Sequence, residues 1–142
     1  MSDTTIVINL ALALFFGGLI GWFREKEKKT AGMRTHILVC LGSALFMIVS
    51  INMLQLASNA DPGRIAAGVV TGIGFIGAGT IVQTRGGVRG ITTAACIWVT
   101  SAIGICAGAS LYTTATAGTI LTVAALQIIR EVEVRLLKTK EE

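Results

Sequence analysis

The stretch GVVTGIGFIGAGTIVQTRGGVRGITTAA, residues 68–95, decides the fold that the sequence predicts. It contains most of an uncharged run over residues 65–84, in which five of the 20 residues are glycine. In water each interior glycine costs a helix about 1 kcal/mol relative to alanine. In a bilayer, an apolar run of about 20 residues must be helical to satisfy its backbone polar groups, and small residues let neighbouring helices approach. We therefore interpret this stretch as the most crowded transmembrane helix of a bundle.

The glycines of this helix, and pairs spaced four apart in two other apolar runs, are predicted to pack against neighbouring helices. These positions are Gly17, Gly21, Gly68, Gly72, Gly74, Gly77, Gly79, Gly104 and Gly108. Gly72-x-Gly74-x-x-Gly77 also matches a dinucleotide-binding fingerprint, but that motif requires a preceding strand and a βαβ unit. Helix packing is the preferred interpretation, and unwinding of the helix at a binding site, as in transporters, is an alternative.

Composition indicates a membrane protein. Of the 142 residues, 53% are hydrophobic and 14% are charged, whereas soluble domains carry about 25% charged residues. The net charge is +4, and the basic residues lie at the edges of apolar runs without interleaved aromatic residues. This pattern suits membrane lipids and topology control, and does not favour nucleic acid as a partner. Three cysteines, Cys40, Cys96 and Cys106, lie in apolar runs and are expected to be free thiols.

Five apolar runs predict an all-α polytopic fold, a single membrane domain over residues 1–142 with five transmembrane helices in a compact glycine-rich bundle. The predicted spans are residues 4–23, 35–60, 64–84, 91–108 and 111–129. The last two come from one uncharged run of 40 residues, which as a single helix would be about twice as long as the bilayer core is thick. Asp61 followed by Pro62 predicts the start of the third helix. The charged tail, residues 130–142, is predicted to continue as a short amphipathic helix.

The basic residues predict the orientation of the bundle. With five spans, eleven of the twelve Lys and Arg residues share one side of the membrane, and Arg64 alone lies on the other. By the positive-inside rule, the N-terminus is outside and the C-terminus is cytoplasmic. A four-span alternative is rejected because it would place the basic tail outside.

The acidic residues argue against a magnesium pump. Mg²⁺ prefers oxygen ligands that usually include carboxylates, yet none of the eight Asp and Glu residues lies within a predicted span, and only Asp61 touches one. A pathway lined by hydroxyls, amides and backbone carbonyls stays open as an alternative. The single histidine has no serine or cysteine nucleophile motif beside it, so we expect no enzyme activity, no bound metal and no cofactor.

One cluster of polar residues is a candidate binding site. Arg34, His36, Arg85 and Arg89 fall on the predicted cytoplasmic side, near Thr92 and Thr93 at the start of the fourth span. We hypothesise that they form a basic mouth that binds a lipid phosphate, an anion or an acidic residue of a partner. The alternative is that these residues only anchor the topology and that His36 lies among the headgroups.

Three blocks, residues 18–46, 61–81 and 88–108, resemble the MgtC/SapB family of bacterial inner-membrane proteins. The resemblance covers nearly the whole chain in the family's order and implies a five-span membrane domain. It also implies a set of functional candidates. These are Arg34, Thr35, Asp61, Arg64, Gly72 to Gly79, Arg89, Gly90, Thr92 and Thr93. One departure is Phe23, which stands where the family commonly has an acidic residue.

The resemblance further implies a link to magnesium limitation, to virulence in some pathogens and to the modulation of membrane complexes such as the F-type ATP synthase. We expect a non-enzymatic regulator in the bacterial inner membrane, acting as a homo-oligomer, specifically a dimer. The alternative is a small transporter or channel that works as an oligomer. Several family members continue into a soluble domain after the membrane part, and we expect none here.

Overall fold

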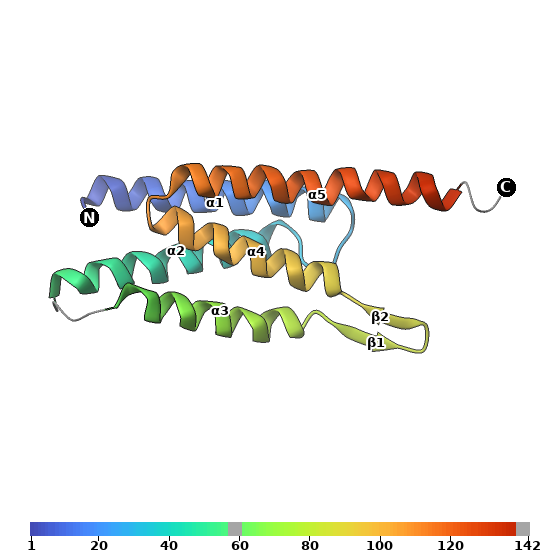
Figure 1. Cartoon of the computed structure of the whole chain (residues 1–142), viewed down its shortest axis with the longest axis horizontal. Coiled ribbons are helices and arrows are strands. Elements are labelled where there is room, and N and C mark those ends of the chain that lie inside the picture. The colour runs from blue at the N-terminus through green and yellow to red at the C-terminus, as the bar shows by residue number, and fades with distance from the viewer. Residues whose placement is uncertain (57–60, 139–142) are drawn as a thin grey trace.

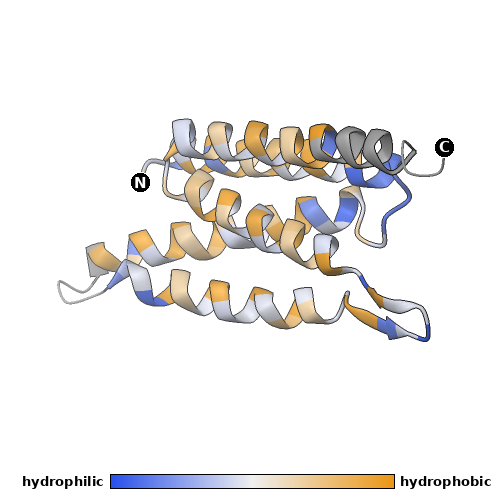
Figure 2. Ribbon diagram, turned by 45° about the vertical axis from the view of Figure 1, so that its right-hand side comes forward, coloured by the Kyte–Doolittle hydropathy of each residue, from blue (hydrophilic) through white to orange (hydrophobic). Residues whose placement is uncertain are grey.

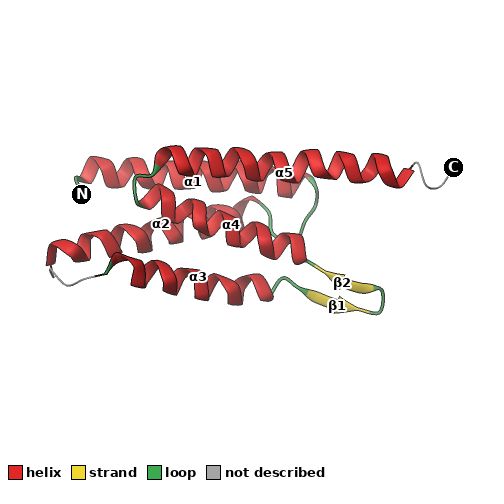
Figure 3. Cartoon of the chain, in the orientation of Figure 1, coloured by secondary structure: helices red, strands yellow, loops and turns green. Residues whose placement is uncertain are grey.

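Five helices run alternately in opposite directions along the long axis of the molecule (Figure 1). The computed structural model describes residues 1–56 and 61–138, without the side chains of residues 55, 56 and 129–138. The helices are α1 (Asp3–Lys26), α2 (Met33–Leu56), α3 (Pro62–Ala78), α4 (Ile91–Gly108) and α5 (Tyr112–Lys138). Between α3 and α4, strands β1 (Val82–Thr84) and β2 (Gly87–Arg89) form an antiparallel hairpin (Figure 3). The predicted bundle of five helices is confirmed, with the hairpin as an addition.

The connections alternate between the two ends of the bundle. The N-terminus and the α4–α5 turn lie at one end, and the α1–α2 loop, the hairpin and the C-terminal end of α5 lie at the other (Figure 1). Hydrophilic residues gather near these ends, whereas the middle of the helices is mostly apolar (Figure 2). Among the described residues, α1, α2 and α4 are long and apolar enough to cross a membrane, and α3 is a shorter apolar helix.

Large apolar side chains cover the outside of the bundle. Phe75 is 85% exposed, Leu121 is 69% exposed and Leu38 is 67% exposed. Apolar surface of this extent is unfavourable in water but is the ordinary surface of a helix in lipid. The exposed surface therefore agrees with the composition in indicating a membrane protein.

The core is built mainly from small residues around α4, which contacts all four other helices. Nine of its 18 residues are buried, whereas only two of the 17 residues of α3 are buried. Ser43 of α2 and Ser101 of α4 are joined by a 2.8 Å hydrogen bond inside the bundle. The three cysteines are free thiols, as predicted. The prediction that the glycine-rich span is the most crowded helix is wrong for the single chain, because that helix is α4.

The glycine contacts show the same difference between α3 and α4. A Cβ atom added at Gly17, Gly21 or Gly108 would lie 2.5–2.6 Å from a backbone atom of α2, and one at Gly104 would overlap the carbonyl oxygen of Cys40. The predicted packing role holds at these four positions. By contrast, an added Cβ at Gly68, Gly72 or Gly74 meets nothing within 4 Å, and one at Gly77 makes only ordinary contact with Ala94. The glycines of α3 therefore do not bring another helix of the described chain close to it, with Gly77 as a partial exception.

The start of α3 follows the prediction, but its end does not. Asp61 caps the helix, since its Oδ1 accepts a 2.8 Å hydrogen bond from the backbone N–H of Gly63. The helix ends at Ala78, although the apolar run continues to residue 84, because residues 82–84 pair with residues 87–89 in the hairpin. Gly90 closes this connection with a φ of +93°, and a Cβ there would overlap the carbonyl oxygen of Thr80. The left-handed conformation and this contact both require glycine.

Other boundaries also shift. The predicted spans 4–23 and 35–60 leave residues 24–34 as a charged connection, but in the structure α1 continues to Lys26 and α2 begins at Met33. Glu25 stabilises the start of α2, because its Oε2 accepts a 2.8 Å hydrogen bond from the backbone N–H of Met33. The tail continues α5 without a break to Lys138, which confirms that it is helical. Residues 57–60, the end of the predicted second span, lie outside the described residues.

Candidate functional site

Arg24 is a charged residue buried inside the bundle, with 2% of its surface exposed. It follows Gly17 and Gly21 on the buried face of α1, where helical spacing brings positions 17, 21 and 24 together. Its Nη2 donates a 2.6 Å hydrogen bond to Oγ1 of Thr93, at the start of α4. Its buried Nε has no hydrogen-bond partner. The guanidinium therefore retains a donor that is not used within the described residues.

His36 lies close to this arginine and is completely buried. Its Nδ1 is 2.8 Å from the carbonyl oxygen of Gly32, and its Nε2 has no partner. The backbone of α1 passes directly against it, since a Cβ at Gly17 would lie 2.6 Å from the carbonyl oxygen of His36. The charge of Arg24 also acts on the imidazole. These two side chains hold both of the unpartnered buried nitrogen atoms found in the described part of the chain.

A cavity of about 640 Å³ opens beside Arg24, between the end of α1, the start of α4 and the middle of α5. Its polar lining includes Arg24, Glu27, Lys29, Thr92 and Thr93. Glu27 is held in place partly by Gln127 of α5, whose Nε2 is 3.4 Å from its Oε1. We call this space the basic-end cavity. Among the side chains that the structure describes, its lining contains two cationic groups and one carboxylate.

The chemistry of the basic-end cavity favours an oxyanion. A buried guanidinium acts in a medium of low effective dielectric, so its attraction for an anion is stronger than in water. Its planar N–H groups match the geometry of phosphate and carboxylate oxygens. The cavity can therefore bind a group that carries a phosphate or a carboxylate, and the carboxylate of Glu27 admits a positive or hydroxyl-bearing group beside it.

The structure brings together only part of the predicted basic mouth. Thr92 and Thr93 line the cavity, and His36 lies behind Arg24. The exposed side chains of Arg34, Arg85 and Arg89 do not line it, although the hairpin that carries Arg85 and Arg89 lies at the same end. Thr35 is half-buried in the first turn of α2.

Asp61 and Arg64 lie apart from this group. Both are exposed at the start of α3, at the opposite end of the bundle (Figure 1). The carboxylate of Asp61 is engaged in capping α3. Any function of this pair is therefore separate from the basic-end cavity.

Arg24 is the functional candidate that the sequence prediction missed. Because the charged residues Glu25, Lys26 and Glu27 follow it, the sequence places Arg24 in a charged connection between the first two predicted helices. A usable signal was present, because Arg24 continues the Gly17 and Gly21 face of the first helix by three further residues.

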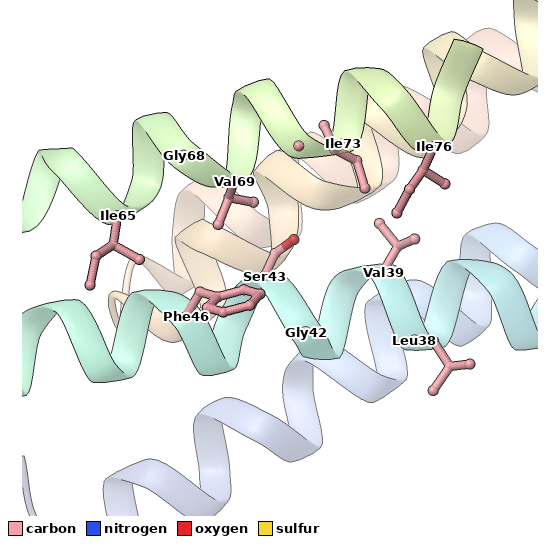
Figure 4. A pocket seen from close by; sticks show the side chains of 11 residues that line it. Leu38, Val39, Gly42, Ser43, Phe46, Ile65, Gly68, Val69, Ile73 and Ile76 are labelled. Carbon is pink, nitrogen blue, oxygen red and sulfur yellow. The ribbon is translucent and has the colours of Figure 1, made fainter. Parts of the chain in front are cut away.

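A second hollow lies between α2 and α3 and is apolar. It has a volume of about 670 Å³, and Gly68 and Gly72 contribute to its wall. Figure 4 shows Ile65, Val69 and Ile76 of α3 projecting toward α2 across this space. We call it the α2–α3 groove. It has no charged residue in its lining.

Among the residues that the structure describes, no three His, Cys, Asp or Glu side chains gather in a way that could hold a metal ion.

Comparison with known proteins gives a clear family match: the model described as MgtC family matches residues 10–135. The chain is 46% identical over 136 residues to the putative magnesium transporter YhiD of Escherichia coli, covering 92% of this chain and 63% of that protein.

Two further relatives carry the name MgtC. The protein from Salmonella typhimurium is 40% identical over 130 residues, which cover 92% of this chain and 54% of that protein. The protein from Brucella abortus is 40% identical over 121 residues, which cover 85% of this chain and 50% of that protein. The chain thus spans between half and two thirds of the length of these curated relatives. No solved structure matches it.

Proposed function

This chain belongs to the MgtC family, and from that premise we propose that it is a non-enzymatic regulator of other membrane complexes, linked to magnesium limitation or virulence adaptation. The names of its relatives support a magnesium-related role in a membrane. Because the chain spans only part of those relatives, their complete activities are part of the proposal. The bacterial inner membrane is its proposed location.

The observation that carries the proposal is the buried guanidinium of Arg24. A divalent cation entering the basic-end cavity would meet this fixed positive charge together with Lys29, and among the described side chains of the lining Glu27 is the only carboxylate that would attract it. An anionic group of a lipid or of a partner protein would be attracted there instead. The cavity therefore supports contact with membrane components better than passage of Mg²⁺.

A small transporter or channel is the second candidate, because one relative is named a putative magnesium transporter. The two candidates differ in what the purified protein does alone. In proteoliposomes that enclose a Mg²⁺ indicator, we expect no Mg²⁺ entry above that of protein-free liposomes, with an ionophore as the positive control. Rapid, Mg²⁺-selective entry would overturn the regulator proposal.

A regulator should change the activity of another membrane complex. Inverted inner-membrane vesicles offer a direct assay, in which ATP-driven proton pumping by the F-type ATP synthase is followed with a pH-sensitive dye. We expect pumping to change when the protein is incorporated and to stay unchanged with the destabilised variant Gly104→Ala. Unchanged pumping with the wild-type protein would remove this synthase from the proposed partners.

We also propose that all five helices cross the membrane, with the N-terminus outside. The alternating helices and the basic residues of the α1–α2 loop and the hairpin support this arrangement. Single cysteines at Ser2 and Gly86, in a chain with the native cysteines replaced by alanine, test it with a membrane-impermeant reagent on intact cells. We expect labelling at residue 2 only, and labelling at residue 86 would contradict the orientation.

A further inference from the structure

The basic-end cavity continues into a third hollow that is apolar. This hollow has a volume of about 330 Å³ and lies between α4 and α5. Thr92, Ala125 and Leu126 line both spaces, so the two hollows lie side by side, and we call the stretch at these three residues the neck. We call the apolar part the α4–α5 groove. It gives the basic-end cavity an extension with a different chemical character.

The α4–α5 groove points from the end of the bundle toward its middle. It follows α4 from Thr92 through Cys96 to Val99, which at 1.5 Å per residue is about 10 Å along the helix axis. On the other wall it reaches from Leu126 back to Leu121 of the antiparallel α5. A ligand that fills both spaces would have a polar part at the end of the bundle and an apolar part beside the helices.

We propose that this joined site binds one phospholipid, with its headgroup phosphate against Arg24 and an acyl chain in the α4–α5 groove. The proposal rests on the five-span arrangement, which places the basic-end cavity at the level of the headgroups and the groove within the hydrocarbon. It does not depend on whether the protein regulates or transports.

The phosphate is held by the guanidinium. Thr93 fixes Arg24 through Nη2, which leaves the unpartnered Nε, and Lys29 supplies a second cation in the same lining. Charge-assisted hydrogen bonds of this kind are about twice as strong as neutral ones. Binding of the phosphate gives the orphaned arginine nitrogen an acceptor inside the bundle.

The carboxylate of Glu27 selects the kind of headgroup. The ammonium of an ethanolamine headgroup would be attracted to Glu27 by its charge, whereas the hydroxyls of a glycerol headgroup are uncharged and could only donate hydrogen bonds to it. Two cations and one carboxylate therefore complement a zwitterionic headgroup with a phosphate and an amine. The site accordingly favours phosphatidylethanolamine over phosphatidylglycerol.

The acyl chain fixes the orientation of the lipid and adds little to the binding affinity. Leaving the bilayer for an apolar groove exchanges one apolar surrounding for another, so the hydrophobic gain is small. The α4–α5 groove instead holds the lipid in one orientation against α4, and the headgroup supplies the selectivity. Blocking the neck between the two spaces should therefore abolish binding of the intact lipid.

Native mass spectrometry of the protein in detergent, titrated with defined lipids, tests the proposal. Ala125 lies at the neck and is exposed, so Ala125→Trp would fill the neck while leaving the buried core untouched. Ala117→Trp is the matched control, since Ala117 is an exposed alanine on the same helix. We expect Ala125→Trp to weaken phosphatidylethanolamine binding by at least about tenfold, equivalent to about 1.4 kcal/mol, and Ala117→Trp to leave it unchanged.

Two further experiments test which chemical groups hold the lipid. Thr93→Val removes the hydroxyl that holds Arg24. We expect it to weaken binding of phosphatidylethanolamine and phosphatidylglycerol alike without blocking the groove, because both lipids carry the phosphate that Arg24 holds. Inorganic phosphate alone should not compete with the lipid at equal concentration. Equal lipid binding by the Ala125→Trp and Ala117→Trp proteins, or full competition by phosphate, would overturn the proposal. Failure of the five-span arrangement would appear separately, in the cysteine labelling.

Discussion

Helices α3 and α4 both carry a pair of glycines spaced four apart and have nearly the same length, 17 and 18 residues, but they have opposite surroundings. Helix α4 lies among the other four helices, and a Cβ at its Gly104 or Gly108 would collide with the backbone of α2. Helix α3 lies at the side of the bundle, and its Gly68, Gly72 and Gly74 meet nothing within 4 Å. Glycine spacing thus indicates that another helix can approach closely. It does not indicate which helix packs there.

The difference has a physical cause. Close backbone approach requires a second helix that is itself smooth, and α2 presents such a surface to α4 at Cys40 and Ala44. On the other side, α2 meets α3 with Val39 and Phe46, whose bulk keeps the helices apart and leaves the α2–α3 groove (Figure 4). Gly68 and Gly72 are exposed in the wall of this groove, and we propose that the homodimer expected from the sequence forms through this side of α3, where glycines allow a second chain to approach.

The largest effect is expected from Gly104→Ala. The new Cβ would overlap the carbonyl oxygen of Cys40, so α2 and α4 must separate. Overpacking of this kind costs about 1–3 kcal/mol, and contact with rigid backbone puts this site at the upper end. Thermal unfolding in detergent should show a clear decrease in the melting temperature. A melting temperature equal to that of the wild type would contradict the closer packing of α4 relative to α3.

A smaller loss is expected from Ser101→Ala, which leaves the buried hydroxyl of Ser43 without its partner on α4. The expected cost is about 1 kcal/mol, measured by the same unfolding experiment. The matched variant on α3 is Thr71→Ala, because the Thr71 hydroxyl is exposed and bonds only to Ala67 of its own helix. Equal losses at the two positions would contradict the difference in burial.

Gly72→Ala should have an effect of the opposite sign. The added methyl group meets nothing in the described chain, and alanine is the better helix former by up to about 1 kcal/mol. We expect a melting temperature equal to or slightly above that of the wild type. A decrease comparable to that of Gly104→Ala would show that α3 packs against something outside the single chain.

Gly72→Leu separates monomer stability from self-association. The larger side chain points into open space in the chain, so the monomer should unfold at a temperature no lower than the wild type. If two chains meet through α3, the same side chain should prevent the dimer. Chemical crosslinking in membranes measures the dimer, with Ala11→Leu on α1 as a comparison, since Ala11 is exposed and lies outside the α2–α3 groove. A dimer unaffected by Gly72→Leu would remove α3 from the proposed interface.

Much of the fold could be predicted because apolar length and local signals decide it. The five helices, the Asp61 cap and the close approach at Gly17 and Gly21 depend on residues that are near one another in sequence or on one helix face. The hairpin was missed because residues 81–83 extend the apolar run of α3 without a charge. Hydrophobicity cannot distinguish a short exposed strand from the last turn of an apolar helix.

The candidate site was harder to predict than the fold. Thr93 could be chosen from the sequence, but the role of Arg24 depends on Thr93 lying opposite it, 69 residues further along the chain. The exposed Arg34 and Arg89 carry the same charge as Arg24 and gave a stronger local signal. Burial decides between these arginines, and burial is a property of the assembled helices.

The central place of α4 also constrains how the chain is made. This helix is the fourth to leave the ribosome, yet it contacts all the others, so its contacts with α1, α2 and α3 can form only after those three helices have been synthesised. Until then α1 and α2 can already pair through Gly17 and Gly21, while the hydroxyl of Ser43 faces lipid without its partner. The arrival of α4 is therefore the step that gives the Ser43 hydroxyl its partner and covers this polar side of α2.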